Sequence, residues 1–401
     1  MLCSVPSLNS ALGVECCGSA APDACRRRVE RSSLRAMKAD SIGQLIMTGV
    51  PGKELDAETA RLFRRVQPGA YILFGRNLES GTQLRKLIDD LRDLSEIEPI
   101  ITIDQEGGRV SRLRRIGNEP PNAQQLRDKN DIDLIRRHGD ITGRLLRLFG
   151  FNLDLCPVLD ISFNDDAENS LHGRCYGKDV EQVVRNAGAF NEAMREQGIA
   201  SCGKHFPGYS AATSDAHFQL PRIDRTREEL DLNELAVFRR FVRDVDSMMV
   251  CHAWYPCFER EPTPATVSHR IVTELLRNEF GFDGLIMTDD LDMGAILTAY
   301  RLDDTIRFCL EAGNDIMMLC HRVPEIETVQ RILGTLPSDQ IERAQQHIGD
   351  FKKNLSPPQK FSESAFQEIN REIADLRTAV VGKEEAGRVV TERQISPVER
   401  F

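Results

Sequence analysis

The stretch GLIMTD at residues 284–289 is a short apolar run that ends in a carboxylate, and its form recurs along the chain. Its middle shows no alternation of polar and apolar residues, which is typical of a strand buried on both faces of a parallel sheet. Seven other stretches share its mostly apolar middle, so we predict eight buried strands. The other seven occupy residues 45–50, 70–75, 99–104, 151–161, 199–204, 247–252 and 315–320.

Segments with helical periodicity separate these runs. They occupy residues 82–94, 134–148, 180–197, 228–245, 270–280 and 305–312. A strand followed by a helix, repeated around eight strands over roughly 300 residues, predicts an α/β fold of the (β/α)8 TIM barrel class. A doubly wound open sheet shares the same alternation and is the competing architecture. The number of units favours the closed barrel.

The two ends of the chain do not follow this alternation of strands and helices. Residues 1–37 are rich in Ser, Ala, Gly and Cys and show no periodicity, so we predict a flexible tail there. The barrel domain is predicted to span residues 38–355. An amphipathic stretch at residues 363–376 then predicts a helix. We interpret residues 356–401 as a C-terminal helical extension with a frayed end.

Composition narrows the functional classes. The chain has 401 residues, 52 Lys plus Arg against 62 Asp plus Glu, a net charge of −10 and 41% apolar residues. An acidic chain without a clustered basic face gives little electrostatic support for nucleic-acid binding. No run approaches the ~18 apolar residues of a membrane span, and the amino terminus lacks the pattern of a secretory signal. We therefore expect a monomeric, cytoplasmic protein that binds a small ligand.

The cysteines give no sign of a metal site or a disulfide framework. Their number is 11, which is odd, and the chain shows no signal segment, so reduced thiols are expected. Cys16 and Cys17 are adjacent, but no second Cys or His pair follows at the spacing of a zinc finger. We predict that the protein uses no metal ion and no other cofactor.

Charged or ionisable residues stand at the carboxyl ends of five of the eight runs. They are Asp104, Asp160, Lys204 with His205, His252, and Asp289 with Asp290. Any one Asp here has a simple alternative role, because Asp commonly caps helices and occupies loops. In a barrel, however, the carboxyl ends of all strands surround one cavity, where catalytic groups lie. The repeated pattern therefore predicts a polar active site at this end of the barrel.

The segment after the fifth run, residues 204–217, carries two further candidates. Asp215 stands two residues before His217, and a carboxylate at that distance can hydrogen-bond an imidazole and orient it. An oriented His is a general acid and base. A surface Asp and His with no common task is the alternative interpretation. Gly208 and the small residues after it give this loop the freedom to reach over a pocket.

Three motifs carry a resemblance to a known family. They are DQEGGRV at residues 104–110, KHFPG at 204–208 with the Asp215-x-His217 ending, and GFDGLIMTDDLDMGA at 281–295. With shorter matches at residues 72–77 and 312–315, the similarity extends over residues 41–320. The sequence resembles the β-N-acetylglucosaminidases of glycoside hydrolase family 3, of the single-domain NagZ type.

The resemblance implies a retaining hydrolase that removes a terminal β-linked GlcNAc through a covalent intermediate. Asp289 would be the nucleophile and Asp290 would be structural, while His217, oriented by Asp215, would act as the acid and then as the base. The implied substrate is a GlcNAc-containing muropeptide fragment of peptidoglycan recycling. His252 is a weaker candidate. Five residues would surround the cleaved sugar: Asp104, Arg112, Arg174, Lys204 and His205.

The residue types themselves support part of this assignment. A nucleophile must be ionised at neutral pH, and cations beside Asp289, such as Lys204 and Arg174, would lower its pKa. An anion beneath the anomeric carbon also stabilises an oxocarbenium-like transition state. A carboxylate at the end of a buried strand is rigidly placed for both tasks. The acid/base, by contrast, stands on a loop, and we expect this loop to gate the reaction.

The sequence departs from the family pattern at two places. Residues 209–212 read Tyr-Ser-Ala-Ala, where the family usually has His-Gly-Asp-Thr. The number of residues from the start of the loop to its Asp-x-His ending is kept. The pair Asp215 and His217 is therefore present, although the residues before it differ from the family pattern. In the loop that carries the predicted arginine, Cys175 and Tyr176 replace the more usual Ser and Phe, which we regard as a mild change.

Three other interpretations stay open. A family 3 β-glucosidase generally takes its acid/base from a second domain, for which we expect no room after Cys320. A divalent-metal site at Asp289, Asp290, Asp292 and His252 would be spoiled if residues 289 and 290 point to opposite faces, as successive strand residues do. A sugar-binding protein without activity is the third, because a fold alone never guarantees catalysis. Either water or phosphate is open as the acceptor of the sugar.

Overall fold

The computed structural model describes residues 42–166, 169–212, 215–216 and 218–387. Within them, parallel strands close into a barrel in the order β1-β10-β9-β8-β7-β6-β3-β2, with β1 also paired to β2. The strands are β1 (Ile46–Gly49), β2 (Ala70–Leu73), β3 (Ile100–Ile103), β6 (Leu153–Asp154), β7 (Ala200–Phe206), β8 (Ser247–Val250), β9 (Leu285–Asp290) and β10 (Ile316–Leu319). Each overlaps one predicted run. The (β/α)8 barrel is confirmed, and the open sheet is excluded.

Apolar side chains are buried on both faces of these strands. All residues of β2 and all residues of β10 are buried, although they alternate between the barrel interior and the surrounding helices. Tyr71 of β2, for example, packs against Phe63 of helix α2 (Ala57–Val66), with ring centroids 5.1 Å apart. Continuous apolar runs therefore suit strands that have the core on one side and helices on the other.

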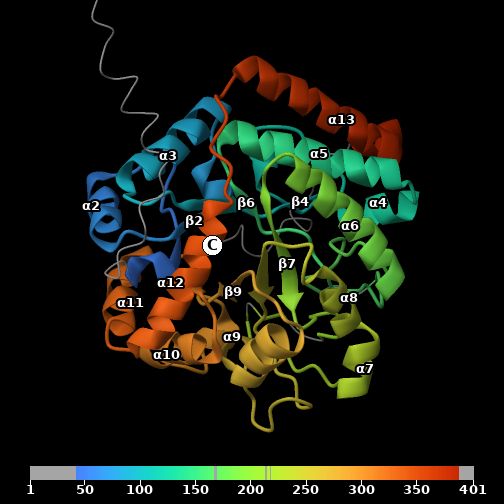
Figure 1. Ribbon diagram of the computed structural model, residues 1–401. Helices are drawn as coiled ribbons and strands as arrows, with labels where there is room; N and C mark the ends of the chain where they lie inside the picture. Colours follow the sequence, from blue (N-terminus) through green and yellow to red (C-terminus); the bar gives the residue numbers. More distant parts are fainter. Residues whose placement is uncertain (1–41, 167–168, 213–214, 217, 388–401) are drawn as a thin grey trace, which may run out of the picture. The chain divides into compact units, whose positions relative to one another are not determined.

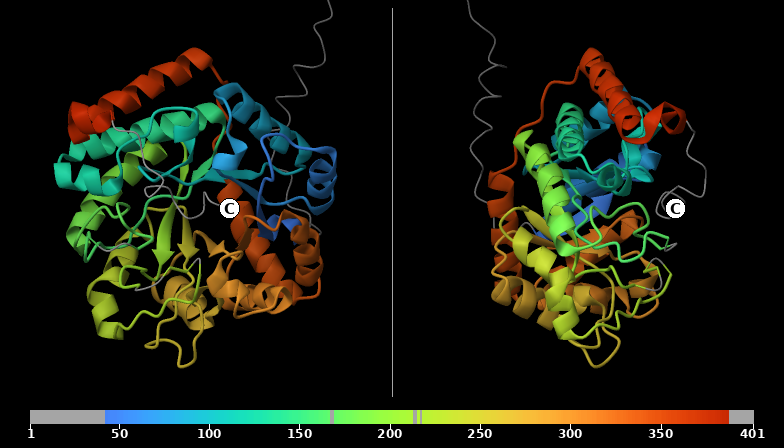
Figure 2. Two further views of the ribbon diagram at one scale, coloured as in Figure 1. Left: turned by 180° about the vertical axis from the view of Figure 1, so that it is seen from behind. Right: turned by 90° about the vertical axis from the view of Figure 1, so that its right-hand side faces the viewer.

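Helices surround the strands, as Figure 1 shows, and Figure 2 shows the same arrangement from behind. Side chains of the expected type cap several of them: Asp56 accepts hydrogen bonds from the first turn of α2, and Asp179 does so for α6. Between the strands lie α2, α3 (Gly81–Leu94), α4 (Ala123–Lys129), α5 (Ile132–Phe149), α6 (Val180–Glu196), α7 (Arg227–Leu232), α8 (Glu234–Phe241), the π-helix η6 (Arg270–Glu279), α9 (Gly294–Leu297) and α10 (Leu302–Ala312).

One predicted helix is wrong in part. We expected a single helix over residues 228–245, whereas the structure has α7 and α8, separated at Asn233. The backbone of Asn233, with φ −123° and ψ −96°, is not helical. Its side-chain amide donates to the carbonyl of Glu229 at 2.8 Å, which is the kind of local bond by which Asn competes with a helix. The break places Glu234 at the start of α8.

After β10 the chain forms α11 (Ile326–Leu333), α12 (Ser338–Lys353) and α13 (Glu363–Ala386). Helix α13 contains the predicted amphipathic segment and lies along α5 (Figure 1), where Glu372 pairs with Arg144 at 2.6 Å. The predicted tail at residues 1–37, with its Cys16–Cys17 pair, lies outside the described residues. Of the extension predicted at residues 356–401, with its frayed end, residues 388–401 also lie outside them. The domain limits at residues 37 and 355 stay predictions.

Two further findings concern the described residues alone. None of their helices combines the length with the apolar composition that crossing a bilayer requires. The seven cysteines that they contain are all free.

Candidate active site

Polar side chains from several strand ends line one pocket at the carboxyl end of the barrel. Six of the eight residues predicted for the site border it: Asp104, Arg112, Arg174, Lys204, His205 and Asp289. Arg109, Ser170 and Asp290 also contribute, together with apolar residues such as Phe74 and Met318. Asp215 is described but does not line this pocket, and His217 lies outside the described residues. Six of the predicted residues thus lie together, as expected if strand ends share one cavity, while their roles stay predictions.

A chain of ion pairs joins the floor of the pocket. The Lys204 ammonium lies 2.7 Å from Asp104 Oδ1 and 2.7 Å from Glu106 Oε1. The Arg174 guanidinium forms two bonds with the Glu106 carboxylate, each 2.7 Å long. Arg112 Nη2 lies 3.2 Å from Asp104 Oδ2. Positive and negative groups alternate, so each buried charge has an opposite charge within hydrogen-bonding distance.

The pairing fixes the ionisation of these groups. Burial would raise the pKa of Glu106, but attraction from Arg174 and Lys204 lowers it to about 2. Burial also opposes ionisation of Asp104, yet Lys204 and Arg112 hold the pKa of this carboxyl well below its usual range. The two carboxylates in turn raise the pKa of Lys204 above its usual value, although burial alone would lower it. All three side chains are charged at neutral pH.

Glu106 is the residue of this network that the sequence analysis did not assign. It belongs to a short hairpin, β4 (Gln105–Gly107) with β5 (Val110–Ser111), which follows β3 directly. Gly107, with φ +104°, lets the hairpin pass against Pro121, whose carbonyl oxygen would lie 2.3 Å from a Cβ at this position. The available signal was the place of Glu106 in the DQEGGRV motif, two residues after Asp104.

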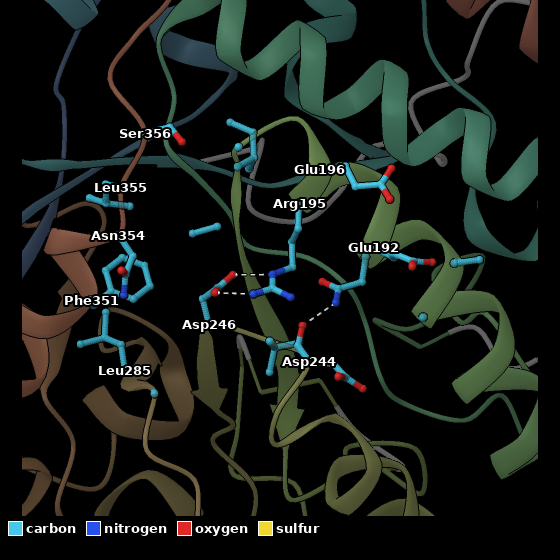
Figure 3. A pocket seen from close by; sticks show the side chains of 18 of the residues that line it. Glu192, Arg195, Glu196, Asp244, Asp246, Leu285, Phe351, Asn354, Leu355 and Ser356 are labelled. Carbon is cyan, nitrogen blue, oxygen red and sulfur yellow. Dashed lines mark hydrogen bonds and ion pairs between the residues drawn. The ribbon is translucent and has the colours of Figure 1, made fainter. Parts of the chain in front are cut away.

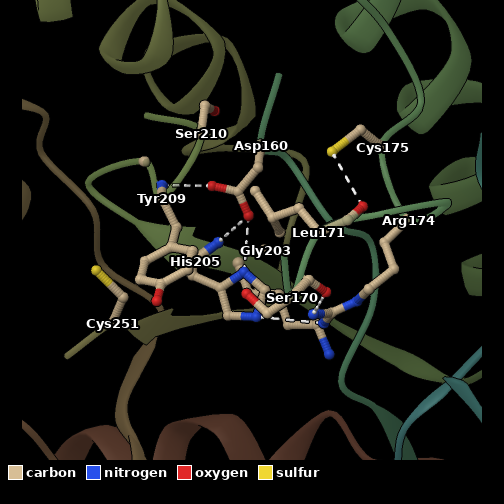
Figure 4. A network of polar contacts seen from close by, with 12 residues as sticks. Asp160, Ser170, Leu171, Arg174, Cys175, Gly203, His205, Tyr209, Ser210 and Cys251 are labelled. Carbon is tan, nitrogen blue, oxygen red and sulfur yellow. Dashed lines mark hydrogen bonds and ion pairs between the residues drawn. The ribbon is translucent and has the colours of Figure 1, made fainter. Parts of the chain in front are cut away.

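A second group of contacts centres on Asp160, as Figure 4 shows. Its Oδ2 lies 2.7 Å from His205 Nδ1, and its Oδ1 accepts the backbone N–H of Tyr209 at 2.6 Å. Because Nδ1 bonds the carboxylate, the other ring nitrogen of His205 is directed to Arg174, 3.4 Å away. Asp160, which lies in the loop six residues after β6 and not at the strand end as predicted, therefore fixes the orientation of a pocket histidine.

Lys204 and His205 are consecutive, yet both border the pocket. Strand β7 contains both, and its pairing with β8 shifts between Gly203 and Phe206. Such an irregularity re-aims a side chain that would otherwise point away. Strand β9 is similar: its pairing with β10 shifts near Asp290, and both Asp289 and Asp290 border the pocket. The expectation that these two carboxylates would face opposite sides was therefore wrong.

The two carboxylates at the end of β9 differ in their surroundings. Asp289 is partly exposed in the pocket, and its Oδ1 accepts the N–H of Asp290 at 2.8 Å. Asp290 accepts the N–H groups of Asp292 and Cys320 at 3.0 and 3.1 Å. Burial, together with the negative charge of Asp292, raises the pKa of Asp290 to about 7. Asp290 thus holds the loop that follows β10, and Asp289 is the carboxylate presented to a ligand.

The cations that we expected beside Asp289 are engaged elsewhere. Lys204 and Arg174 border the same pocket, but their ion pairs are with Asp104 and Glu106. His252 is also placed differently from the weaker expectation. It is fully buried, with one ring nitrogen 2.7 Å from Thr266 Oγ1 and the other 3.0 Å from the carbonyl of Asp290. It does not line the pocket and supports the end of β9.

The coordination alternative finds no support among the residues that the structure describes. They contain no group of three or more His, Cys, Asp or Glu side chains arranged to hold a metal ion. Asp292, one of the four suggested ligands, instead pairs with Arg322 at 2.5 Å.

A hollow larger than this pocket lies at the opposite end of the barrel, beside the amino ends of β7, β8 and β9 (Figure 3). Its charged lining is paired internally: Arg195 binds Asp246 at 2.8 and 2.9 Å. Asp246 also accepts the backbone N–H of Ser201 at 2.9 Å. Groups at this end of a barrel serve stability rather than catalysis, so the smaller pocket is the candidate active site.

A barrel whose carboxyl end sets the Asp289 carboxylate among fixed hydrogen-bonding charges has the parts of a glycoside hydrolase. The profile of the Glycosyl hydrolase family 3 N terminal domain matches residues 37–350. The β-hexosaminidase of Vibrio cholerae serotype O1 is 32% identical over 326 residues, which are 80% of this chain and 93% of that protein. The chain belongs to glycosyl hydrolase family 3 and is a glycoside hydrolase.

Solved structures agree with this placement. A glycoside hydrolase family 3 β-N-acetylglucosaminidase from a Paenibacillus species is similar with a TM-score of 0.77 and 31% identity, covering 84% of this chain and 68% of that one. Native NagZ from Neisseria gonorrhoeae is similar with a TM-score of 0.72 and 28% identity, covering 83% of this chain and 97% of that one. The family resemblance read from the three motifs is confirmed.

Replacing Glu106 with Gln should raise KM at least about tenfold and lower the free energy of unfolding by about 3 kcal/mol, because two buried cations lose their shared counter-charge. Steady-state kinetics and urea unfolding measure the two effects. Glu119→Gln is the matched control, since Glu119 also pairs with two cations, Arg114 and Arg377, but neither of these borders the pocket, whereas Lys204 and Arg174 do. A normal KM for Glu106→Gln would remove Glu106 from the binding network.

Asp154, beneath the pocket, should make stability depend on pH. It is fully buried, with Oδ1 accepting the N–H of Gln105 at 3.0 Å, and burial raises its pKa from 3.8 to about 7. Because the pKa of Asp154 is higher in the folded than in the unfolded state, its contribution to stability is complete below pH 3.8. This contribution is lost as the pH rises towards 7.

Asn has no such group to ionise. As the pH rises through this interval, the unfolding free energy of Asp154→Asn should therefore increase relative to that of the wild type by about 1.4 kcal/mol per pH unit. Urea unfolding at several pH values between the two pKa values measures the difference. Parallel curves for the two proteins would show that Asp154 ionises normally in the folded chain.

Proposed function

We propose that this protein is a retaining exo-β-N-acetylglucosaminidase, which releases a terminal β-linked GlcNAc through a covalent glycosyl-enzyme. One observation carries the proposal: Asp289 shares a pocket with Asp104, Lys204, Arg174 and His205 at the carboxyl end of the barrel. Charged hydrogen-bonding groups of this kind bind sugar hydroxyls and hold the anomeric carbon in place. A strand-end carboxylate beside them is suited to attack that carbon.

In the proposed first step, the Asp289 carboxylate attacks the anomeric carbon and His217 gives its proton to the leaving glycosidic oxygen. In the second step, His217 takes a proton from water, and the water oxygen displaces the carboxylate of Asp289. Asp289 is well positioned for this task because the N–H of Asp290, in the same rigid strand, bonds one of its oxygens at 2.8 Å. Asp290, whose pKa is raised to about 7, is only partly ionised at neutral pH and so carries less negative charge than an ordinary aspartate.

The role of His217 rests on its neighbours in the chain. The preceding residue, Ala216, accepts a hydrogen bond at its carbonyl from the N–H of Ala295 at 3.0 Å. Ala295 belongs to α9, which begins four residues after β9 ends at Asp290. The loop that carries Asp215 and His217 is therefore tied to the segment that follows the nucleophile. This link supports a common site for the two catalytic groups.

The substrate class is proposed from the relatives. Similar proteins are named β-hexosaminidase and β-N-acetylglucosaminidase, and one is NagZ, so we propose a GlcNAc-containing muropeptide fragment and a role in peptidoglycan recycling. A cytoplasmic location, a monomeric state and water as the acceptor belong to the same proposal. So do the domain limits at residues 37 and 355.

The test is a panel of substrates with the full chain: GlcNAc-anhydro-muramic acid, chitobiose and a chromogenic β-glucoside, each with and without inorganic phosphate. We expect turnover of the GlcNAc compounds, fastest with the muramic acid derivative, and no rate increase from phosphate. Faster turnover of the β-glucoside would favour the β-glucosidase alternative. Binding of GlcNAc without any turnover would favour a non-catalytic sugar-binding protein.

A further inference from the structure

Tyr209 occupies the position at which the loop after β7 turns away from the barrel, and it is one of the residues that depart from the family pattern. It is almost completely buried, with 6% of its surface exposed. Its ring lies beside the imidazole of His205, with centroids 6.2 Å apart, as Figure 4 shows. A buried phenol needs a polar partner for its hydroxyl group.

The partner lies within the same loop. Tyr209 Oη accepts the backbone N–H of Ala216 at 3.0 Å, seven residues further along the chain. The backbone N–H of Tyr209 itself donates to Asp160 Oδ1 at 2.6 Å. Tyr209 therefore connects the carboxylate of Asp160, which also orients His205, with the backbone of Ala216.

Ala216 is held from two sides. The hydroxyl of Tyr209 bonds its N–H, and the N–H of Ala295 in α9 bonds its carbonyl oxygen at 3.0 Å. Both backbone groups of Ala216, its N–H and its carbonyl, are therefore engaged. These two contacts fix the backbone of the residue that directly precedes position 217 in the sequence.

The start of the loop gives Tyr209 a firm base. The hydroxyl of Tyr255 donates to the carbonyl of Gly208 at 2.6 Å, and the N–H of Ile161 donates to Ser210 Oγ at 2.8 Å. Gly208 has φ +123°, and a Cβ there would lie 2.4 Å from Cβ of Glu234, so the backbone packs directly on α8. The residues on both sides of Tyr209 are thus anchored to separate elements of the barrel.

From these contacts we infer that Tyr209 is a positioning residue, which aligns the acid/base of the proposed reaction by bonding the Ala216 backbone with its phenol hydroxyl. The inference rests on the proposed function, because it assigns the aligned group to position 217. Burial also raises the pKa of Tyr209 above its usual range, so the hydroxyl stays neutral in the working range of pH. The hydroxyl acts through the backbone and does not touch the substrate.

The test is Tyr209→Phe, which removes one oxygen atom and keeps the ring. Two aryl β-GlcNAc substrates are compared by kcat/KM: one with a good leaving group, dinitrophenol, and one with a poor leaving group, an unactivated phenol. Misaligned acid catalysis slows only the poor leaving group, for which protonation matters. We expect a loss of about 10- to 100-fold on that substrate and less than about threefold on the activated one.

Two comparisons make the result decisive. Tyr71→Phe removes a hydroxyl from a fully buried tyrosine outside the pocket and should leave kcat/KM unchanged on both substrates. His217→Ala tests the proposed function by itself. If His217→Ala shows the leaving-group dependence and Tyr209→Phe does not, the positioning role is overturned while the acid role stands. If His217→Ala shows no such dependence, the acid role fails first. Equal losses of Tyr209→Phe on both substrates, with a lower melting temperature, would indicate a purely structural tyrosine.

Discussion

Replacing Asp289 with Asn is expected to lower kcat/KM for a chromogenic β-GlcNAc glycoside by at least about 10⁴-fold, which corresponds to about 5.4 kcal/mol of lost transition-state stabilisation. Asn keeps the shape of the side chain and its hydrogen bond from the N–H of Asp290. It carries no negative charge, so it neither forms the glycosyl ester nor stabilises the positive charge at the anomeric carbon. Turnover by the purified variant measures the loss.

The neighbouring carboxyl provides a matched control. Asp290→Asn makes the same chemical change one residue away in the same pocket. Because the pKa of Asp290 is raised to about 7, an amide resembles its protonated form, and the oxygen that accepts from Asp292 and Cys320 is kept. We expect a loss below about tenfold for this variant. If Asp290→Asn were the inactive variant and Asp289→Asn the active one, the two roles would have to be exchanged.

Replacing His217 with Ala should divide substrates by leaving group. For an unactivated aglycone, kcat/KM should fall by about 10²- to 10⁴-fold, since the departing oxygen must leave without a proton from the enzyme. For dinitrophenol, which leaves readily as an anion, kcat/KM should change little. The second step should be slowed for both substrates, because water loses its general base.

An added nucleophile separates the two steps. Azide needs no general base, so it should restore kcat of His217→Ala on the dinitrophenyl substrate and yield a glycosyl azide of retained configuration. The wild type should not respond. If azide has no effect and both aglycones lose rate equally, His217 is not the acid/base, and Asp215 or a group outside the described residues takes that role.

Much of the fold followed from the sequence because a buried parallel strand carries a strong signal. Each predicted run, from residues 45–50 to residues 315–320, overlaps a strand of the barrel. The signal was weaker where one side chain changes the backbone. The helix expected over residues 228–245 is broken at Asn233, whose side chain bonds the carbonyl of Glu229. The hairpin after β3 was missed as well, since its strands have only three and two residues.

The site could be predicted as a set of residues but not as a set of pairs. Position at a strand end is a property of the sequence, and it identified Asp104, Lys204, His205 and Asp289. Which cation binds which carboxylate depends on side-chain packing across strands far apart in the sequence. Lys204 and Arg174 were therefore expected beside the nucleophile, whereas Glu106 holds both of them. The rule that successive strand residues point to opposite faces also fails at strand irregularities, which place adjacent residues in one pocket.

The most direct test of the account is to trap the glycosyl-enzyme. The reagent is a GlcNAc derivative that carries one fluorine on the ring and fluoride as the leaving group. The ring fluorine slows both steps, whereas the good leaving group speeds only the first, so the glycosyl-enzyme accumulates. Mass spectrometry of the digested protein should find one labelled sugar on the peptide that contains GLIMTDD, with fragmentation assigning it to Asp289. No label under conditions of turnover, or a label on another residue, would contradict Asp289 as the nucleophile.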